Sequence, residues 1–165
     1  MSEVVSDQNR RTPPWLFELL QKHVKTKFKI DAAATKKNAL CKRFFTEKED
    51  GLLQHWDEDT FCNPPYKYFR NWIEKAYHEA NEREIITCLI GPKGCSQRWY
   101  HDYAKRGSIY APDDRLVFND SVTGEPTGGA REDSMIYILG PGWMNKDTTR
   151  FRYYPLSVRG MVVTL

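Results

Sequence analysis

The sequence has no long hydrophobic run. The longest, Ile85–Ile90 and Met161–Leu165, are far shorter than the roughly 18 residues that a membrane-spanning helix needs. Residues 1–11 are polar and contain no hydrophobic segment of the kind found in a signal peptide. We therefore expect a cytoplasmic protein with no membrane partner.

Cysteine is scarce, and no two cysteines form a Cys-x-x-Cys pair. The four cysteines stand at positions 41, 62, 88 and 95, and none has a histidine at a zinc-site spacing. Two disulfides are arithmetically possible, but a chain of this length buries about 70% of its unfolded surface without them. With no export signal, we expect free thiols and no metal.

Neither sign of charge dominates, and flexible residues are not in excess. Lys plus Arg number 25 and Asp plus Glu 22, a net charge of +3, which permits a nucleic-acid partner without indicating one. The hydrophobic content of 40% and the aromatic content of 13% exclude a disordered chain. We expect a flexible arm over residues 1–11 and one domain over residues 12–165.

Short apolar segments alternate with helical patterns and Gly or Pro stops. This alternation predicts an α/β fold with a mixed, mostly parallel sheet. The expected helices are 12–20, 36–45, 68–81 and 97–105; the expected strands are 28–31, 60–62, 84–90, 108–110, 115–118, 134–139 and 160–164, with a loop over 121–131.

The most informative motif is Asn63-Pro64-Pro65-Tyr66, directly after an expected strand. The two prolines stiffen the loop and remove two N–H donors. An exocyclic amine of a base is a poor nucleophile, because its lone pair is delocalised into the ring. The Asn63 side-chain oxygen and the Pro64 carbonyl can accept its two hydrogens and favour a pyramidal nitrogen, while Tyr66 offers a ring face for a flipped base.

The same four residues also fit an ordinary turn, since Asn-Pro and Pro-Pro both favour turns. Their position favours a site. They lie between a strand and an amphipathic helix, at the carboxyl edge of an expected α/β sheet, where ligands bind.

Over roughly residues 12–139 the sequence resembles the phage DNA N-6-adenine methyltransferases. The resemblance rests on an ordered set of segments: Thr12-Pro13 with Leu16-Phe17, Ile30–Ala34, Asn38, Phe44–Thr46, Glu49–Leu52, Trp56, Phe61–Tyr66, Trp72–Ala76, Gly91-Pro92 and Trp99. It implies a single compact Rossmann-like methyltransferase domain, S-adenosylmethionine as the methyl donor and adenine in double-stranded DNA as the substrate.

The resemblance also implies roles for single residues. Thr12 and Pro13 match the segment along the methionine part of the cofactor. Asp31 matches an acidic residue that binds the ammonium group or the ribose hydroxyls of the cofactor. Asp50 matches an acidic residue that accepts a hydrogen bond from the adenine amine of the cofactor. Taken alone, Thr12 and Asp31 could be helix caps, and Asp50-Gly51 a turn.

One departure concerns the cofactor loop. The first half of the chain contains no Gly-x-Gly, and Ala32-Ala33-Ala34 stands where many adenine methyltransferases have glycines. These small side chains could admit the cofactor, although with less backbone freedom than glycine gives.

Contacts with DNA are expected from basic residues, because phosphate binding requires positive charge. Lys93 and Arg98 are favoured, since they follow the strand next along from the motif. Trp56 is grouped with them as an expected DNA contact. Since it stands in a polar loop, it is expected either to cover the substrate or cofactor or to plug the space under its loop.

Three functions remain open. The first is transfer of a methyl group to adenine N6 in DNA, with short or relaxed sequence specificity, because a chain of this size has no room for a separate recognition domain. The second is methylation of RNA adenine or of protein glutamine by the same loop. The third is a non-catalytic DNA- or cofactor-binding relative.

Overall fold

The computed structural model describes residues 10–120, 122–127, 133–146 and 153–158. Most of the expected arm and the expected strand at 160–164 lie outside these ranges. The last two arm residues form β1 (Arg10–Arg11), which pairs antiparallel with β7 (Asn119–Asp120). The chain is therefore already attached to the fold at residue 10.

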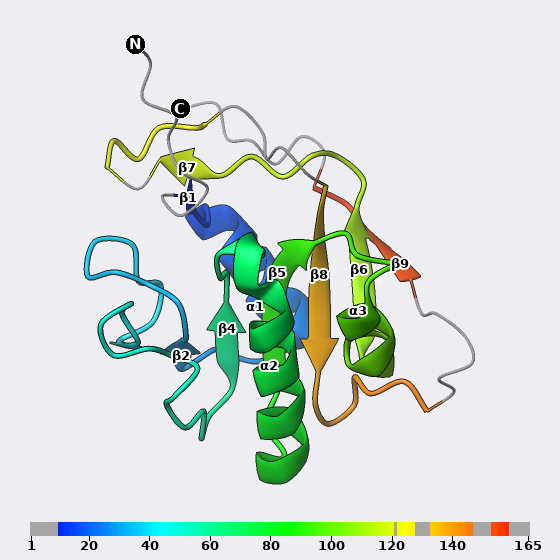
Figure 1. The fold of residues 1–165 in the computed structure, drawn as a ribbon. Helices are drawn as coiled ribbons and strands as arrows, with labels where there is room; N and C mark the ends of the chain where they lie inside the picture. Colours follow the sequence, from blue (N-terminus) through cyan, green and yellow to red (C-terminus); the bar gives the residue numbers. More distant parts are fainter. Residues whose placement is uncertain (1–9, 121, 128–132, 147–152, 159–165) are drawn as a thin grey trace.

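The described residues contain one large sheet of seven strands in the order β3-β2-β4-β5-β8-β6-β9 (Figure 1). The pairings β2–β3, β2–β4, β4–β5 and β6–β9 are parallel, and β8 runs antiparallel to both of its neighbours. The expectation of a mixed, mostly parallel sheet is confirmed. The strands are β2 (Ile30–Asp31), β3 (Arg43–Phe44), β4 (Thr60–Cys62), β5 (Thr87–Pro92), β6 (Ser108–Pro112), β8 (Ser134–Leu139) and β9 (Tyr153–Leu156).

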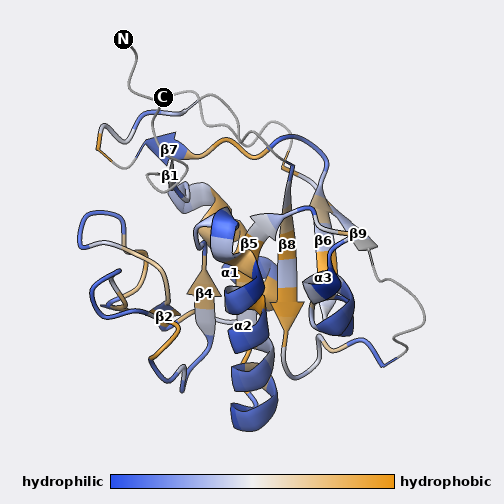
Figure 2. Cartoon of the chain, viewed as in Figure 1, coloured by the Kyte–Doolittle hydropathy of each residue, from blue (hydrophilic) through white to orange (hydrophobic). Residues whose placement is uncertain are grey.

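Alternate residues of the central strands face opposite sides of the sheet, as the two-residue period of a strand requires. In β8, Ile136 and Ile138 belong to one hydrophobic cluster, whereas Tyr137 and Leu139 belong to the other. Both faces are thus apolar, which is why the strands read as continuous hydrophobic runs and are coloured largely as such in Figure 2.

Helices cover both faces of the sheet and give three layers. Helix α1 (Pro14–Val24) packs on one face through Leu16, Phe17, Leu20 and Val24. Helices α2 (Phe69–Arg83) and α3 (Arg98–Asp102) pack on the other face (Figure 1). Two 3-10 turns, η2 (Tyr66–Tyr68) and η3 (Ala104–Arg106), adjoin α2 and α3. No helix in the described ranges is long and apolar enough to cross a membrane.

Three local predictions are wrong. Residues 36–45 form turns and β3 instead of a helix, because Asn38 Oδ1 and the Asp31 carboxylate accept from the backbone N–H groups of Thr35 and Leu40. Residues 115–118 are not a strand; the short β7 begins at Asn119. The N-cap of α1 is Pro13 rather than Thr12, with proline also in the first turn.

The parallel strands β2, β4 and β5 end at one edge of the sheet. The chain that follows them carries Ala32–Ala34, Asn63–Tyr66 and Lys93, respectively. The β1–β7 pair lies at the same edge (Figure 1). Loops that are distant in sequence therefore meet at the place where ligands bind in α/β sheets.

Candidate active site

A cavity of about 660 Å³ lies at this carboxyl edge, within the roughly 300–1,000 Å³ typical of ligand pockets. It is lined by three stretches of chain and by Phe118. These are Ala32–Thr35 with Asn38, Phe45–Glu47 with Asp50–Leu52, and Asn63–Tyr68 with Asn71 and Trp72. The predicted residues Ala32, Ala33, Asp50 and Asn63–Tyr66 thus surround one space.

One wall is formed by close contact between Ala32 and the Asp50-Gly51 turn. A Cβ atom on Gly51 would lie 2.1 Å from the Ala32 carbonyl oxygen, so only glycine allows this approach. Asp50 has a φ of 54°, a left-handed conformation that is uncommon outside glycine. Its Oδ1 atom accepts a hydrogen bond of 3.0 Å from Leu52 N, so the carboxylate is held at the cavity wall.

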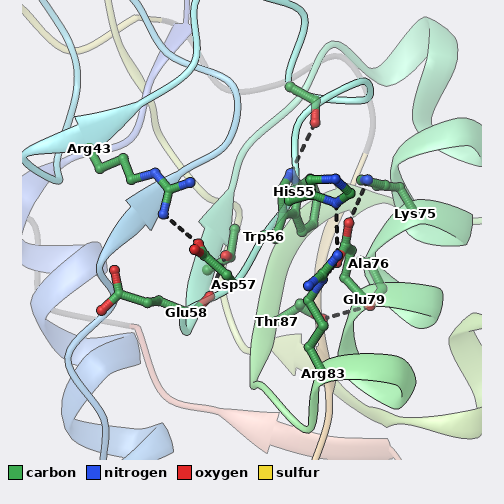
Figure 3. A network of polar contacts seen from close by, with 12 residues as sticks. Arg43, His55, Trp56, Asp57, Glu58, Lys75, Ala76, Glu79, Arg83 and Thr87 are labelled. Carbon is green, nitrogen blue, oxygen red and sulfur yellow. Dashed lines mark hydrogen bonds and ion pairs between the residues drawn. The ribbon is translucent and has the colours of Figure 1, made fainter.

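The loop that carries Asp50 is fastened to α2 by a polar network (Figure 3). Glu79 is buried and accepts from Lys75 Nζ and Arg83 Nε, both at 2.5 Å. Arg83 also contacts His55 Nδ1 at 2.7 Å. Burial alone would raise the pKa of Glu79, but the hydrogen bonds from Lys75 and Arg83 outweigh it and lower the pKa. The network therefore holds a charged anchor beneath the loop.

Trp56 belongs to this anchor and not to a DNA-binding surface. Its side chain is fully buried, and Nε1 donates a 2.9 Å hydrogen bond to the Gly51 carbonyl. The expectation of a DNA contact at Trp56 is corrected accordingly. The indole fills the space under the Asp50-Gly51 turn, stacked against Trp72.

The Asn63–Tyr66 loop forms the second wall, and its two polar side chains are held from elsewhere in the chain. Asn63 Nδ2 donates to Thr12 Oγ1 at 2.9 Å. The Tyr66 hydroxyl lies 2.7 Å from Ser134 Oγ, at the start of β8, and the Tyr66 ring contacts Phe69 edge-on. Both Asn63 and Tyr66 are therefore fixed by tertiary contacts in addition to the stiffness of Pro64 and Pro65.

Thr12, Pro13 and Asp31 are not brought to the cavity lining. Asp31 is 3% exposed, and its carboxylate accepts hydrogen bonds from the backbone of Leu40 and Ala33. Burial raises the pKa of Asp31 to about 7, against the lowering effect of these hydrogen bonds. Asp31 thus lies behind the Ala32–Ala34 wall.

Lys93 directly follows β5 and Arg98 begins α3; both are exposed, and neither lines the cavity. The Lys93 backbone N–H donates to the Asp133 carbonyl, and Arg98 Nε lies 3.3 Å from the Asp102 carboxylate. Their charges face solvent. Among the described residues, no group of three His, Cys, Asp or Glu side chains could hold a metal ion.

Several lining residues were not singled out as site residues from the sequence. They are Thr35, Asn38, Phe45, Thr46, Glu47, Leu52, Lys67, Tyr68, Asn71, Trp72 and Phe118. Recognising Arg43–Phe44 as a strand parallel to β2 would have placed Phe45 and Thr46 at the same edge. No local signal marks Phe118, which reaches the cavity from the segment before β7.

A three-layer α/β fold with a cavity at the carboxyl edge and a rigid Asn-Pro-Pro-Tyr loop on its wall defines a Rossmann-like methyltransferase fold. A family model of DNA N-6-adenine-methyltransferase (Dam) matches residues 2–153, and the chain belongs to this family. It is also 25% identical over 131 residues to a DNA N-6-adenine-methyltransferase of Escherichia phage T1, an alignment that covers 68% of this chain. The chain spans 55% of the length of that relative.

Proposed function

We propose that this protein transfers a methyl group from S-adenosylmethionine to the N6 amine of adenine in double-stranded DNA. The observation that carries the proposal is the Asn63–Tyr66 loop on the wall of a 660 Å³ cavity. The lining of the same cavity also offers the small side chains of Ala32 and Ala33 and the Asp50 carboxylate. Family membership supports the same chemistry.

The residues around the cavity fit the cofactor. Ala32 and Ala33 leave room for it beside the end of β2, and the Asp50 carboxylate is an acceptor for an amine or hydroxyl group. The rings of Phe45 and Trp72 supply apolar surface. S-adenosylmethionine, when bound, supplies an electrophilic methyl group. We assign Asp31 to the support of the Ala32–Ala34 wall, since it lies behind that wall.

The Asn63–Tyr66 loop binds and orients the target base. Asn63 Oδ1 and the Pro64 carbonyl accept the two hydrogens of the adenine amine, which directs the nitrogen lone pair toward the methyl group. The Tyr66 ring stacks on the flipped base. The proton leaves after the nitrogen has become positive, so placement of the reacting atoms provides most of the rate enhancement.

DNA would bind across the mouth of the cavity. Lys67 and Tyr68 line the cavity and are exposed, and Lys93 and Arg98 offer further positive charge along the same edge. Contacts of this kind bind phosphates without reading sequence. We therefore propose short or relaxed specificity, and a mapped recognition site of six or more fixed bases would contradict it. A role in marking DNA against restriction, in a bacterial cytoplasm, agrees with this activity.

The test is transfer of labelled methyl from S-adenosylmethionine to unmethylated duplex DNA, with RNA and a protein extract assayed in parallel. Asn63→Ala removes one acceptor from the amine and is expected to lower kcat by at least about 100-fold. Asn81→Ala is the matched control, because Asn81 is exposed on α2 and its side chain donates to the carbonyl of Tyr77 on the same helix.

Label in DNA adenine that is lost in Asn63→Ala and kept in Asn81→Ala would support the proposal. Label found in RNA or in protein glutamine, and not in DNA, would show that DNA is not the substrate. Absence of label from every substrate, with the cofactor still bound, would indicate a binding protein.

A further inference from the structure

The Asn63 side chain has two chemically different ends. Its oxygen accepts hydrogen bonds, whereas its NH₂ group only donates. A target amine offers hydrogens, so the two orientations of the amide are not equivalent. With its oxygen toward the cavity, the amide accepts a hydrogen bond from the target amine. Rotated by half a turn, it would place its own NH₂ donor against the N–H donors of the amine. A loop that uses asparagine therefore needs a partner that fixes the amide.

Thr12 is placed to be that partner. The residue is buried, at 4% exposed, and Oγ1 accepts from Asn63 Nδ2 at 2.9 Å across 51 residues of sequence. Thr12 makes no cap on α1, whose N-cap is Pro13. Its hydroxyl is thus committed to Asn63 rather than to a helix end.

The position of Thr12 is itself fixed from both sides. Arg11, immediately before it, pairs with Asn119 in the β1–β7 ladder. Pro13, immediately after it, has a fixed φ and begins the hydrogen bonding of α1 by accepting from Leu16 N at 3.0 Å. The Thr12 hydroxyl is therefore a rigid reference point beside the Asn63–Tyr66 loop.

We propose that Thr12 is a positioning residue, which holds the Asn63 amide by its NH₂ group and so directs Oδ1 toward the target amine. This inference rests on the proposed function, because it assigns the amide oxygen to an amine substrate. It gives Thr12 a role in substrate orientation and not in cofactor binding, consistent with its place outside the cavity lining.

The first experiment measures the hydrogen bond directly. In ¹⁵N-labelled protein, the side-chain amide signals of Asn63 are assigned by their loss in Asn63→Asp, and their hydrogen exchange rates are compared. Thr12→Val keeps the shape of threonine and removes the acceptor, so exchange should accelerate at least about fivefold. Thr12→Ser keeps the acceptor and should retain slow exchange. Thr12→Ala replaces the valine variant if that protein does not fold.

The second experiment separates orientation from binding. Thr12→Val is expected to lower kcat at least about tenfold and to leave the Kd for S-adenosylmethionine, measured by calorimetry, within about twofold. Thr12→Ser should restore kcat. Asn63→Asp presents two equivalent oxygens, so adding Thr12→Val in that background should cost much less than it does beside the native Asn63.

The outcomes distinguish this inference from the proposed function. Unchanged exchange of the Asn63 amide in Thr12→Val overturns the inference, whatever the activity. So does a rise in the cofactor Kd with unchanged kcat, or a failure of Thr12→Ser to restore kcat. A wild-type protein that methylates no substrate overturns the proposed function, and with it the assigned purpose of the contact, while the exchange rates still decide whether Thr12 holds the amide.

Discussion

Replacing Gly51 by alanine is expected to open the cofactor side of the cavity. The new Cβ atom would lie 2.1 Å from the Ala32 carbonyl oxygen and 3.2 Å from Trp72 Cη2. Normal contacts between such atoms are about 3.5 Å, so the Asp50-Gly51 turn must retreat from Ala32 by more than about 1 Å. The retreat moves the Asp50 carboxylate away from the Ala32–Ala34 wall.

Overpacking of this kind costs about 1–3 kcal/mol, and the lower entropy of the unfolded alanine chain returns about 0.4–1 kcal/mol. We expect a net loss of about 1–2 kcal/mol in the free energy of unfolding. The affinity for S-adenosylmethionine should fall at least about tenfold, equivalent to about 1.4 kcal/mol. Urea unfolding and titration calorimetry measure the two quantities separately.

Gly124→Ala is the matched control. Nothing lies within 4 Å of a Cβ atom there, but the φ of +74° makes alanine unfavourable, by about 1–2 kcal/mol. The lower entropy of the unfolded alanine chain offsets about 0.4–1 kcal/mol of this cost as well. Both variants should therefore lose stability, and only Gly51→Ala should lose cofactor affinity. An unchanged cofactor Kd in Gly51→Ala, or an equal loss in both variants, would refute the reasoning.

Two buried carboxylates should give opposite pH dependences of stability. Burial raises the pKa of Asp31 from 3.8 to about 7, so its favourable contribution is full below about pH 4 and is lost as the pH rises through about 7. The free energy of unfolding of the wild type, measured in urea, should therefore fall relative to that of Asp31→Asn as the pH rises from acid to alkaline. A difference between the two proteins that does not change with pH would contradict this. Hydrogen bonds from Lys75 and Arg83 overcome the effect of burial and lower the pKa of Glu79, so its contribution is present above its unfolded pKa and is lost as the pH falls through the lower folded value. Glu79→Gln should cost about 1.5–3 kcal/mol at neutral pH and less in acid, whereas an equal cost at both pH values would exclude the charged anchor.

The layered fold could be predicted from sequence because its signals are local and repeated. The apolar runs of β5 and β8 are continuous, as expected for strands buried on both faces, and α2 carries its buried residues at helical spacing. Residues 36–45 do not form the predicted helix, since the Leu40 backbone N–H bonds to the Asp31 side chain and Asn38 Oδ1 accepts from the Thr35 backbone N–H. Such competition is invisible in a hydrophobic pattern.

The site was predictable only where one short segment carries it. The Asn63–Tyr66 motif can be recognised from its residue types, and the turn at Asp50 from the Asp-Gly pair. The residues that hold these segments in place cannot be recognised in this way. Asn63 is held by Thr12, 51 residues away, and Tyr66 contacts Ser134, 68 residues away. Trp56 was ambiguous for the same reason, because only tertiary structure decides whether an indole in a polar loop is covered.

The place of β8 in the sheet affects when the cavity can form. This strand lies between β5 and β6, and its first residue, Ser134, contacts Tyr66. During synthesis, every segment that lines the cavity leaves the ribosome before β8, the strand that completes the sheet centre. Contacts of such long sequence separation form late in folding. A nascent chain should therefore retain no S-adenosylmethionine until β8 has inserted, and cofactor retention would report complete folding of the sheet.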